Sequence, residues 1–434
     1  MPVLPSLAAL SVMLASAAPP APAPETARAI ITDLVACGSR HSLSSWTDPK
    51  RGIGCGRDIV VRRFGEIARR SGGRLKVVVD KYQTSAPRTG NVPVPMENVY
   101  AVLEGTDPVL KKTAFVVSGH MDSMPSDIMD PKTDAPGSDD DASGVAVSIL
   151  SAEALAGRAE GFRATLVFAA VAGEEQGLLG AKRLKDWLGE RGYQVGGMIT
   201  DDIVGATNGS KDRRPRIFSE GGPDGIDSPG RQMARLADEL AGRDRVRLVF
   251  RRDRFGRGGD HIPFVEAGLP AIRFTEPLEN YDHQHQTPRE EKGVRYGDFV
   301  EFMDFPFVAQ VAAVNQLLLA ELAAAPAPPS AVVLSGAVTP SAKLAITAPD
   351  DRERQAFEIL IRETTESRWR VLRTVAVTSG TPVVLEGMST DNEFFAVRSL
   401  GRNGHRSLSV AAVPEPRPSV GSVPPAPVTP PKQR

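Results

Sequence analysis

Carboxylates and imidazoles recur at the ends of apolar runs, and together they could bind divalent metal ions. The set consists of His120 and Asp122 after TAFVVSG, Glu174 and Glu175 after ATLVFAAVAG, Asp201 and Asp202 after GGMIT, and His283 and His285 in NYDHQHQTP. If these runs are parallel neighbouring strands, their carboxyl ends meet at one edge of a sheet and bring the side chains together. Without a cation, such a cluster of desolvated charges would be strongly unfavourable.

Three consecutive aspartates, Asp139, Asp140 and Asp141, stand in GSDDDASG immediately before the apolar stretch VAVSIL. A helix N-terminus favours negative charge by about 0.3 to 1 kcal/mol, so one capping aspartate is ordinary. The other two need a further partner. A divalent metal at the same sheet edge would provide it.

The residue types favour zinc. Imidazole with carboxylate and without thiolate suits zinc or a similar hydrolytic metal, and one carboxylate can bridge two ions about 3.5 to 4 Å apart. Magnesium and calcium prefer oxygen ligands, so the histidines count against them. The composition of the cluster therefore predicts two metal ions.

The elements that must position these residues follow an α/β pattern. From about residue 25 to 324, short β-rich runs such as TAFVVSG alternate with helical patterns, for example the one after Ser143. This alternation predicts an α/β fold with a mostly parallel central sheet flanked by helices on both faces. The long apolar stretch from Gly297 to Ala325 is expected to be the helix that closes the domain.

A change of composition marks a second domain. A proline-rich linker is expected at residues 325–330, and alternating apolar residues at 331–412 predict a C-terminal all-β sandwich. Its FFAVRSLGRNGHRS segment resembles the late strands of fibronectin type III domains. The proline-rich tail, residues 413–434, is expected to be disordered.

The amino-terminal segment predicts export. Residues 1–17 end in the small-x-small pattern Ala15-Ser16-Ala17 of a signal peptide, although no basic residue follows Met1. Outside the cytoplasm, Cys37 and Cys55, the only two cysteines, are expected to form a disulfide. We therefore expect a secreted or periplasmic protein. Later stretches predict no membrane span.

The overall charge argues against a nucleic-acid partner. The chain has 52 basic and 53 acidic residues, a formal net charge of −1. Such a balance provides no global field that would attract a phosphate backbone.

Five motifs in order, GHMDS, PGSDDDASG, AGEEQGLLGA, TDDIVG and DHQHQT, resemble the co-catalytic zinc exopeptidases typified by secreted bacterial leucyl aminopeptidase and aminopeptidase Y. The resemblance covers most of residues 30 to 320. It implies two Zn²⁺ ions, with Glu174 as general base and Asp122 orienting an imidazole. The implied metal ligands are His120, Asp140 and Asp202 for one ion, with Asp140 bridging to a second ion held by Glu175 and His285.

Several polar residues nearby have simpler interpretations. Asp139 and Asp141 are expected to make helix-capping and local hydrogen bonds. Asp201 could face solvent, and His283 competes with His285, which the resemblance of HQT to the family's His-x-Thr favours. His261 is interpreted as a supporting or loop histidine, and His41 and His405 as structural or solvated.

The implied activity is removal of amino-terminal residues from peptides or proteins by hydrolysis. Carboxypeptidases and glutaminyl cyclases resemble the same fold, so they remain alternatives. A third alternative is a catalytically silent, receptor-like ectodomain that uses the fold for binding. The β-sandwich either contacts a surface or another protein, or serves as a spacer that steadies the catalytic domain.

Overall fold

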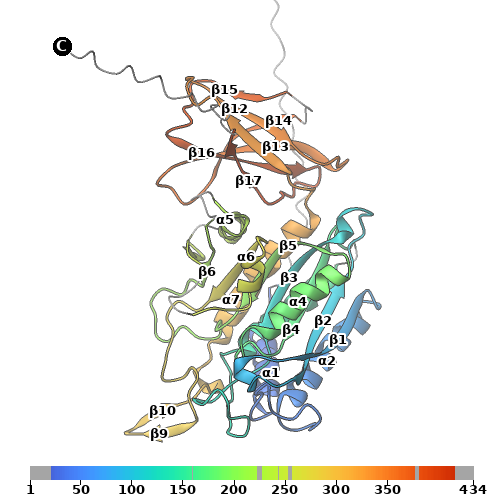
Figure 1. The fold of residues 1–434 in the computed structure, drawn as a ribbon, viewed down its shortest axis with the longest axis vertical. Helices are drawn as coiled ribbons and strands as arrows, with labels where there is room; N and C mark the ends of the chain where they lie inside the picture. Colours follow the sequence, from blue (N-terminus) through green and yellow to red (C-terminus); the bar gives the residue numbers. More distant parts are fainter. Residues whose placement is uncertain are drawn as a thin grey trace, which may run out of the picture.

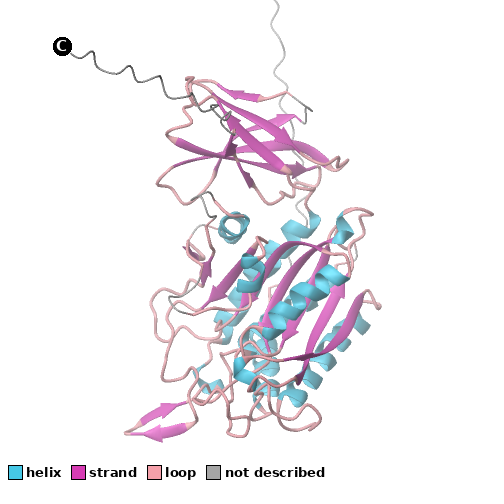
Figure 2. Ribbon diagram, in the orientation of Figure 1, coloured by secondary structure: helices cyan, strands magenta, loops and turns pink. Residues whose placement is uncertain are grey.

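The computed structural model describes residues 21–415 except 159, 222–226, 243, 253–256 and 377–380. The predicted signal peptide at residues 1–17 lies outside the described residues. The described chain forms an α/β domain and a separate β-sandwich, stacked one above the other in Figures 1 and 2.

Within the described residues, the central sheet has eight strands in the order β1-β2-β4-β3-β5-β8-β6-β7. The strands are β1 (Leu75–Thr84), β2 (Val94–Leu103), β3 (Thr113–His120), β4 (Thr165–Val171), β5 (Gln194–Asp201), β6 (Arg216–Phe218), β7 (Arg247–Val249) and β8 (Ala271–Thr275). The consecutive strands β4, β3, β5 and β8 are parallel. Antiparallel pairing joins β1 to β2, β2 to β4 and β6 to β8. The predicted α/β fold is confirmed, with a sheet that is mixed overall and parallel at its centre.

Helices cover both faces of this sheet (Figure 1). On one face lie α1 (Pro24–Val35), α2 (Ile53–Arg70), α3 (Ala142–Ala156), α5 (Pro229–Ala241) and α7 (Phe305–Ala324), and on the other lie α4 (Leu179–Glu190) and α6 (Ile262–Glu266). Successive strand residues point to opposite faces. In β3, Phe115 and Val117 therefore join the core that includes α3, whereas Ala114 and Val116 join the core that includes α4.

The closing helix begins later than the sequence predicted. Residues Val300–Phe302 form a 3-10 turn, and α7 begins only at Phe305. Asp304 caps this helix by accepting a hydrogen bond from the Phe307 amide at 3.1 Å. Pro306 in the first turn suits a helix start and not a helix interior. By length and composition α7 could cross a membrane, but 78% of its most apolar window is buried inside the protein.

The C-terminal domain packs two sheets of the described chain against each other, in the orders β15-β12-β11-β18 and β14-β13-β16-β17. The strands are β11 (Ala331–Ser335), β12 (Ala342–Thr347), β13 (Arg354–Glu363), β14 (Arg370–Ala376), β15 (Val383–Leu385), β16 (Glu393–Gly401), β17 (Val410–Ala411) and β18 (Val413–Pro414). The module runs past its predicted end, because β18 pairs with β11 where a tail was expected. The rest of that predicted tail, from residue 416, lies outside the described residues.

Ion pairs hold the sandwich against the α/β domain. Arg398 makes hydrogen bonds of 2.7 and 3.0 Å to the two carboxylate oxygens of Glu239 in α5. Arg163 makes bonds of 3.0 and 2.9 Å to Asp351 of the sandwich. Because Arg163 precedes the amino end of β4, the sandwich contacts the sheet at the end opposite to the carboxyl ends of the parallel strands. In Figure 1, the hairpin of β9 (Arg289–Glu291) and β10 (Val294–Tyr296) protrudes at the end of the α/β domain that lies away from the sandwich.

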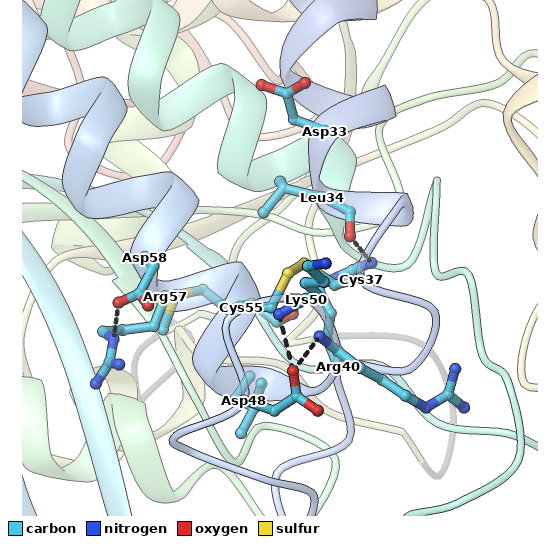
Figure 3. Close-up of a disulfide and its surroundings, with 12 residues drawn as sticks. Asp33, Leu34, Cys37, Arg40, Asp48, Lys50, Cys55, Arg57 and Asp58 are labelled. Carbon is cyan, nitrogen blue, oxygen red and sulfur yellow. Dashed lines mark hydrogen bonds and ion pairs between the residues drawn. A yellow bond between two sulfur atoms is a disulfide. The ribbon is translucent and has the colours of Figure 1, made fainter.

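The predicted disulfide between Cys37 and Cys55 is confirmed, with Cα atoms 5.8 Å apart. It joins the segment after α1 to the first turn of α2, and the carboxylate of Asp48 stabilises the loop between them (Figure 3). Arg40 lies three residues after Cys37 and extends away from the sulfur atoms (Figure 3). The disulfide thus tethers the segment that carries Arg40.

Candidate metal centre

The five predicted metal ligands come together at the carboxyl edge of the central sheet. His120 ends β3, Glu175 follows β4, and Asp202 follows β5. Asp140 precedes α3, and His285 lies in the loop after β8. Their ligand atoms form two triads, within each of which all atoms lie within 4.8 Å of one another.

Asp140 belongs to both triads and offers a different oxygen to each. His120 Nε2 lies 3.1 Å from Asp140 Oδ1 and 3.9 Å from Asp202 Oδ1. His285 Nε2 lies 2.9 Å from Asp140 Oδ2 and 3.2 Å from Glu175 Oε1. His285 has a φ of +54°, in the left-handed region that few residues other than glycine adopt. The geometry is that of a bridging carboxylate between two sites.

Two glycines allow the helix that follows Asp140 to approach the sheet. A Cβ atom at Gly144 would collide with the main-chain oxygen of Asp201, and one at Gly119 would collide with the backbone of Gly144. The amino end of α3 therefore rests directly on β3 and β5. This close contact brings Asp140 beside His120.

The other two aspartates of the run make the predicted capping and local hydrogen bonds, and each also accepts a long-range bond that was not predicted. Asp141 caps α3 by accepting a bond from the Gly144 amide at 2.8 Å, and its other oxygen accepts one from the His120 amide at 2.8 Å. Asp139 accepts bonds from the Gly205 amide at 2.6 Å and from a serine hydroxyl of α3. Each of the three carboxylates thus has a distinct partner, and only that of Asp140 faces both triads.

Asp122 connects the end of β3 to the segment after β4. Its carboxylate accepts hydrogen bonds from the amides of Glu174 and Glu175 at 3.3 and 3.1 Å. The Nδ1 atom of His120 lies 3.1 Å from the main-chain oxygen of Asp122 and 3.6 Å from its carboxylate. With Nε2 facing the triad, Nδ1 is the donor, so the main chain of Asp122 takes the hydrogen bond and its carboxylate adds charge.

The charged groups of the two triads shift one another's pKa values. Burial would lower the pKa of His285, but Glu175 and Asp140 raise it to about 11. Burial would likewise raise the pKa of Asp140, yet the imidazoles of His285 and His120 hold it well below its usual range. The cluster therefore requires positive charge at its centre.

Glu174 is half-buried beside the two triads but belongs to neither of them. Burial, followed by the negative charges of Glu175, Asp202 and Asp260, raises the pKa of Glu174 well above its usual value. Glu174 lines the same cavity as the two triads, so its carboxylate is placed to accept a proton there.

The donor set fits a pair of zinc ions. Tetrahedral zinc with ligands at 2.0 to 2.2 Å places neighbouring ligand atoms about 3.3 Å apart, close to most distances within the triads. Glu175 Oε1 is buried and accepts no hydrogen bond from any described residue. Such an orphaned oxygen, aimed at an imidazole nitrogen and at Asp140, is suited to a metal.

Two competing predictions are also decided by the structure. The ring of His283 stacks on Phe302 with centroids 3.8 Å apart and belongs to neither triad, so His285 is the histidine at the centre. Asp201, for which solvent exposure was considered, is instead fully buried and accepts a hydrogen bond from Asn315 at 2.9 Å.

The remaining histidines lie outside the triads, as expected. His41 is buried, with Nε2 2.9 Å from the main-chain oxygen of Ile128. His405 pairs with Glu321 of α7 at 2.6 Å, and His261 is buried at the start of α6. These contacts are structural.

Arg40 is a supporting residue that the sequence analysis missed. Its guanidinium is fully buried and donates hydrogen bonds to the main-chain oxygens of Met121 at 2.8 Å, Pro136 at 2.6 Å and Gly137 at 2.7 Å. These oxygens lie at the two ends of the loop between His120 and Asp140. Arg40 thus closes that loop. No sequence signal at Arg40 predicts this long-range contact.

Arg273 and Asp298 also support the ligands and were also missed. Arg273 is fully buried and contacts Asp202 Oδ1 at 3.0 Å. It pairs with Thr200 across β5 and β8, so its side chain lies on the same face as Asp202. The carboxylate of Asp298 accepts bonds from the Asp139 and Asp140 amides at 2.9 and 2.8 Å. Strand register could have suggested Arg273 once β5 and β8 were paired.

Comparisons with known proteins identify the family to which the chain is similar. Residues 98–294 match the family described as Peptidase family M28. A probable zinc metalloprotease of Leptosphaeria maculans is 39% identical over 89% of this chain and 94% of its own length. A probable zinc metalloprotease of Pyricularia oryzae is 38% identical over 90% of this chain and 82% of its own length.

Solved structures share the fold at low sequence identity. An aminopeptidase of Legionella pneumophila has a TM-score of 0.53 at 18% identity, covering 70% of each chain. A Zn-dependent exopeptidase of Parabacteroides distasonis has a TM-score of 0.51 at 18% identity, covering 70% of this chain and 99% of that one.

Proposed function

The chain belongs to peptidase family M28, and we propose that it is a zinc-dependent aminopeptidase that hydrolyses amino-terminal residues from peptides. The observation that carries this proposal is the convergence of two complete triads on Asp140, with Glu174 beside them on one cavity. The relatives described as probable zinc metalloproteases support zinc as the metal. Two ions are the proposed occupancy, one in each triad.

The residues present define the roles in catalysis. His120, Asp140 and Asp202 would hold one ion, and Asp140, Glu175 and His285 the other. A zinc pair bound there would acidify the attacking water and polarise the scissile carbonyl. Glu174 takes the proton from that water and returns it to the leaving amine. Asp122 orients His120 and fixes the backbone that carries Glu174.

The complete ligand set favours hydrolysis over the alternatives. Glutaminyl cyclases hold one zinc, whereas both triads are complete here. A silent, receptor-like copy would be expected to have lost ligands or the base, and none of the six residues is missing. The resemblance to leucyl aminopeptidase and aminopeptidase Y favours cleavage at the amino end of the substrate over cleavage at the carboxyl end.

We further propose that the protein is exported and carries a fibronectin type III-like module. The disulfide between Cys37 and Cys55 is typical of an oxidising compartment and supports export. One sheet of the sandwich contains β11, β12, β15 and the two-residue β18, and the other contains β13, β14, β16 and β17; two packed sheets of this kind support the fibronectin-like assignment. The ion pairs to the α/β domain favour the spacer role for this module.

Hydrolysis of leucyl-p-nitroanilide by the purified protein tests the proposed activity, with N-acetyl-leucyl-p-nitroanilide as the blocked substrate. We expect cleavage of the free-amine substrate only, and loss of cleavage with a zinc chelator. Glu174→Gln should lower kcat by about 10² to 10⁴ because the proton acceptor is lost, while the zinc content stays at two ions per chain.

Glu153→Gln is the matched control, because Glu153 lies near the far end of α3 and pairs with the exposed Arg70. Its kcat should equal that of the unmodified protein. Cleavage that is insensitive to chelator, or a Glu174→Gln variant with full kcat, would contradict the proposed mechanism. Cleavage of the N-acetylated substrate would contradict the requirement for a free amine.

A further inference from the structure

A cavity of about 450 Å³ opens over the two triads. Three apolar side chains, Met124, Ile128 and Leu178, line part of its wall. Two cationic side chains, Arg88 and Arg257, also line it, together with Gln284 and two glycines. A cation beside a reaction centre can select substrates by charge, so the partners of these two arginines decide what the cavity accepts.

The charge of Arg257 is already paired. Its Nη1 atom lies 2.9 Å from Glu279 Oε2, and Arg216 lies 2.8 Å from the other oxygen of the same carboxylate. Glu279 is almost fully buried, which strengthens this pairing. The positive charge of Arg257 is therefore balanced within the protein by Glu279.

Arg88 differs because it has no acidic partner. Its one hydrogen bond runs from Nη1 to the main-chain oxygen of Glu175 at 2.8 Å. Among the described residues, no carboxylate lies within ion-pair distance of Arg88, and the side chain is exposed to the cavity. The remaining donors of the guanidinium are available to a substrate.

The loop that carries Arg88 is held firmly. Arg88 belongs to a 3-10 turn (Pro87–Thr89) between β1 and β2. The hydroxyl of the buried Thr89 accepts a hydrogen bond from the Ala86 amide at 2.9 Å and lies 3.1 Å from the main-chain oxygen of Val92. Arg88 is thus fixed at both ends, by this loop and by Glu175. A fixed guanidinium loses less freedom on binding a ligand.

The position of Arg88 beside one triad suits a carboxylate that lies close to the scissile bond. The guanidinium is bonded to the main chain of Glu175, whose side chain belongs to one triad. In a dipeptide, only the peptide nitrogen and one α-carbon separate the scissile carbonyl carbon from the terminal carboxylate carbon. A guanidinium binds a carboxylate through two parallel hydrogen bonds, which gives both affinity and orientation.

This inference rests on the proposed aminopeptidase function. We propose that Arg88 binds a carboxylate on the leaving residue of the substrate, so that the preferred substrates are dipeptides with a free terminal carboxylate. The same chemistry could come from an acidic side chain on the leaving residue. The substrates of the test separate these two sources.

The test measures kcat/KM for three substrates: Leu-Ala, Leu-Ala amide and Leu-Glu amide. We expect Leu-Ala to exceed Leu-Ala amide by about tenfold or more, as is typical of a hydrogen-bonded charge pair. In Arg88→Gln this ratio should fall to near one, mainly through a higher KM for Leu-Ala, and Arg88→Lys should retain part of it. Arg70→Gln, on the exposed face of α2, is the control that should keep the full ratio.

The outcomes distinguish the possibilities. If Leu-Glu amide matches Leu-Ala, an acidic side chain is accepted in place of the terminal carboxylate. Equal kcat/KM for Leu-Ala and both amides, or an unchanged ratio in Arg88→Gln, would overturn the role of Arg88 and leave the aminopeptidase function standing. A zinc-loaded protein that cleaves none of the three substrates would contradict the aminopeptidase function itself, and this inference would fall with it.

Discussion

Replacing Arg40 by methionine should loosen the metal centre without touching a ligand. In the structure, the Arg40 guanidinium joins the main-chain oxygens of Met121, Pro136 and Gly137. The loop between these oxygens separates His120 from Asp140. Methionine can fill the space but offers no donor, so all three oxygens would lose the hydrogen bond from Arg40.

The magnitude follows from these three bonds. The main-chain oxygen of Gly137 keeps a hydrogen bond from the Ala142 amide at 3.1 Å, so the substitution leaves two acceptors, those of Met121 and Pro136, without a donor. A buried acceptor left without its partner costs about 1 to 3 kcal/mol, so two acceptors would cost about 2 to 6 kcal/mol. Removing the cation returns part of this cost, because burial is unfavourable for the charge and lowers the pKa of Arg40 to about 10. We therefore expect Arg40→Met to lower the free energy of unfolding by about 2 to 4 kcal/mol.

Metal affinity should fall as well. Residues that orient metal ligands typically contribute about 10- to 100-fold to affinity, and Arg40 fixes the loop that sets the separation of His120 from Asp140. Urea unfolding of the metal-free protein would measure the stability. Competition with a chromophoric chelator would measure zinc affinity in each variant that folds.

Two further variants test whether the effect is specific to the hydrogen bonds of Arg40. Arg40→Lys retains the charge but cannot reach all three oxygens, so its stability should lie between those of the methionine variant and the unmodified protein. Arg62→Met, at an exposed arginine of α2, should change neither quantity. If Arg40→Met unfolds at the same urea concentration and binds zinc as tightly as the unmodified protein, the proposed role of Arg40 in closing the loop is wrong.

Two other predictions concern the stability of the chain. Replacing Cys37 and Cys55 by alanine should lower the free energy of unfolding by about 3 kcal/mol, from the chain entropy of a loop spanning 18 residues. This should lower Tm by about 6 °C, and an unchanged Tm would show that the loop is ordered without the bond. The second concerns pH: burial would raise the pKa values of Glu239 and Asp351, but Arg398 and Arg163 outweigh it and lower both. Their contribution is therefore complete above the unfolded pKa of about 4 and is lost as the pH falls below it, so Tm should drop between pH 5 and pH 3. The drop should be smaller in Arg398→Met, and equal slopes for the two proteins would count against the interface.

Strand ends indicated where the metal ligands lie, and the family resemblance indicated which residues they are. A parallel strand between helices is a continuous apolar run, and polar residues follow at its carboxyl end. His120, Glu175 and Asp202 all stand at such ends. Their types, imidazole and carboxylate without thiolate, narrow the metal to zinc or a similar ion.

The supporting residues could not be read in this way. Arg40 reaches the loop around Asp140 from about a hundred positions away, and its partners are main-chain oxygens, which every residue has. Arg273 contacts Asp202 only because β5 and β8 are neighbours in one register. The position of Arg88 over the cavity likewise depends on the packing of the β1–β2 loop beside the segment after β4.

Local sequence thus determined the α/β fold, the sandwich, the disulfide and the types of the residues at the metal centre. The hydrophobic periodicity, the residues at strand ends and the number of cysteines can all be read from the sequence without knowing the tertiary structure. Tertiary structure alone decided that Asp201 is buried and which arginines hold the ligands in place, and it placed His285, which the family resemblance favours, beside Asp140. Those outcomes depend on sheet order and strand register. Both arise from long-range packing and cannot be recognised as a periodic pattern in the sequence.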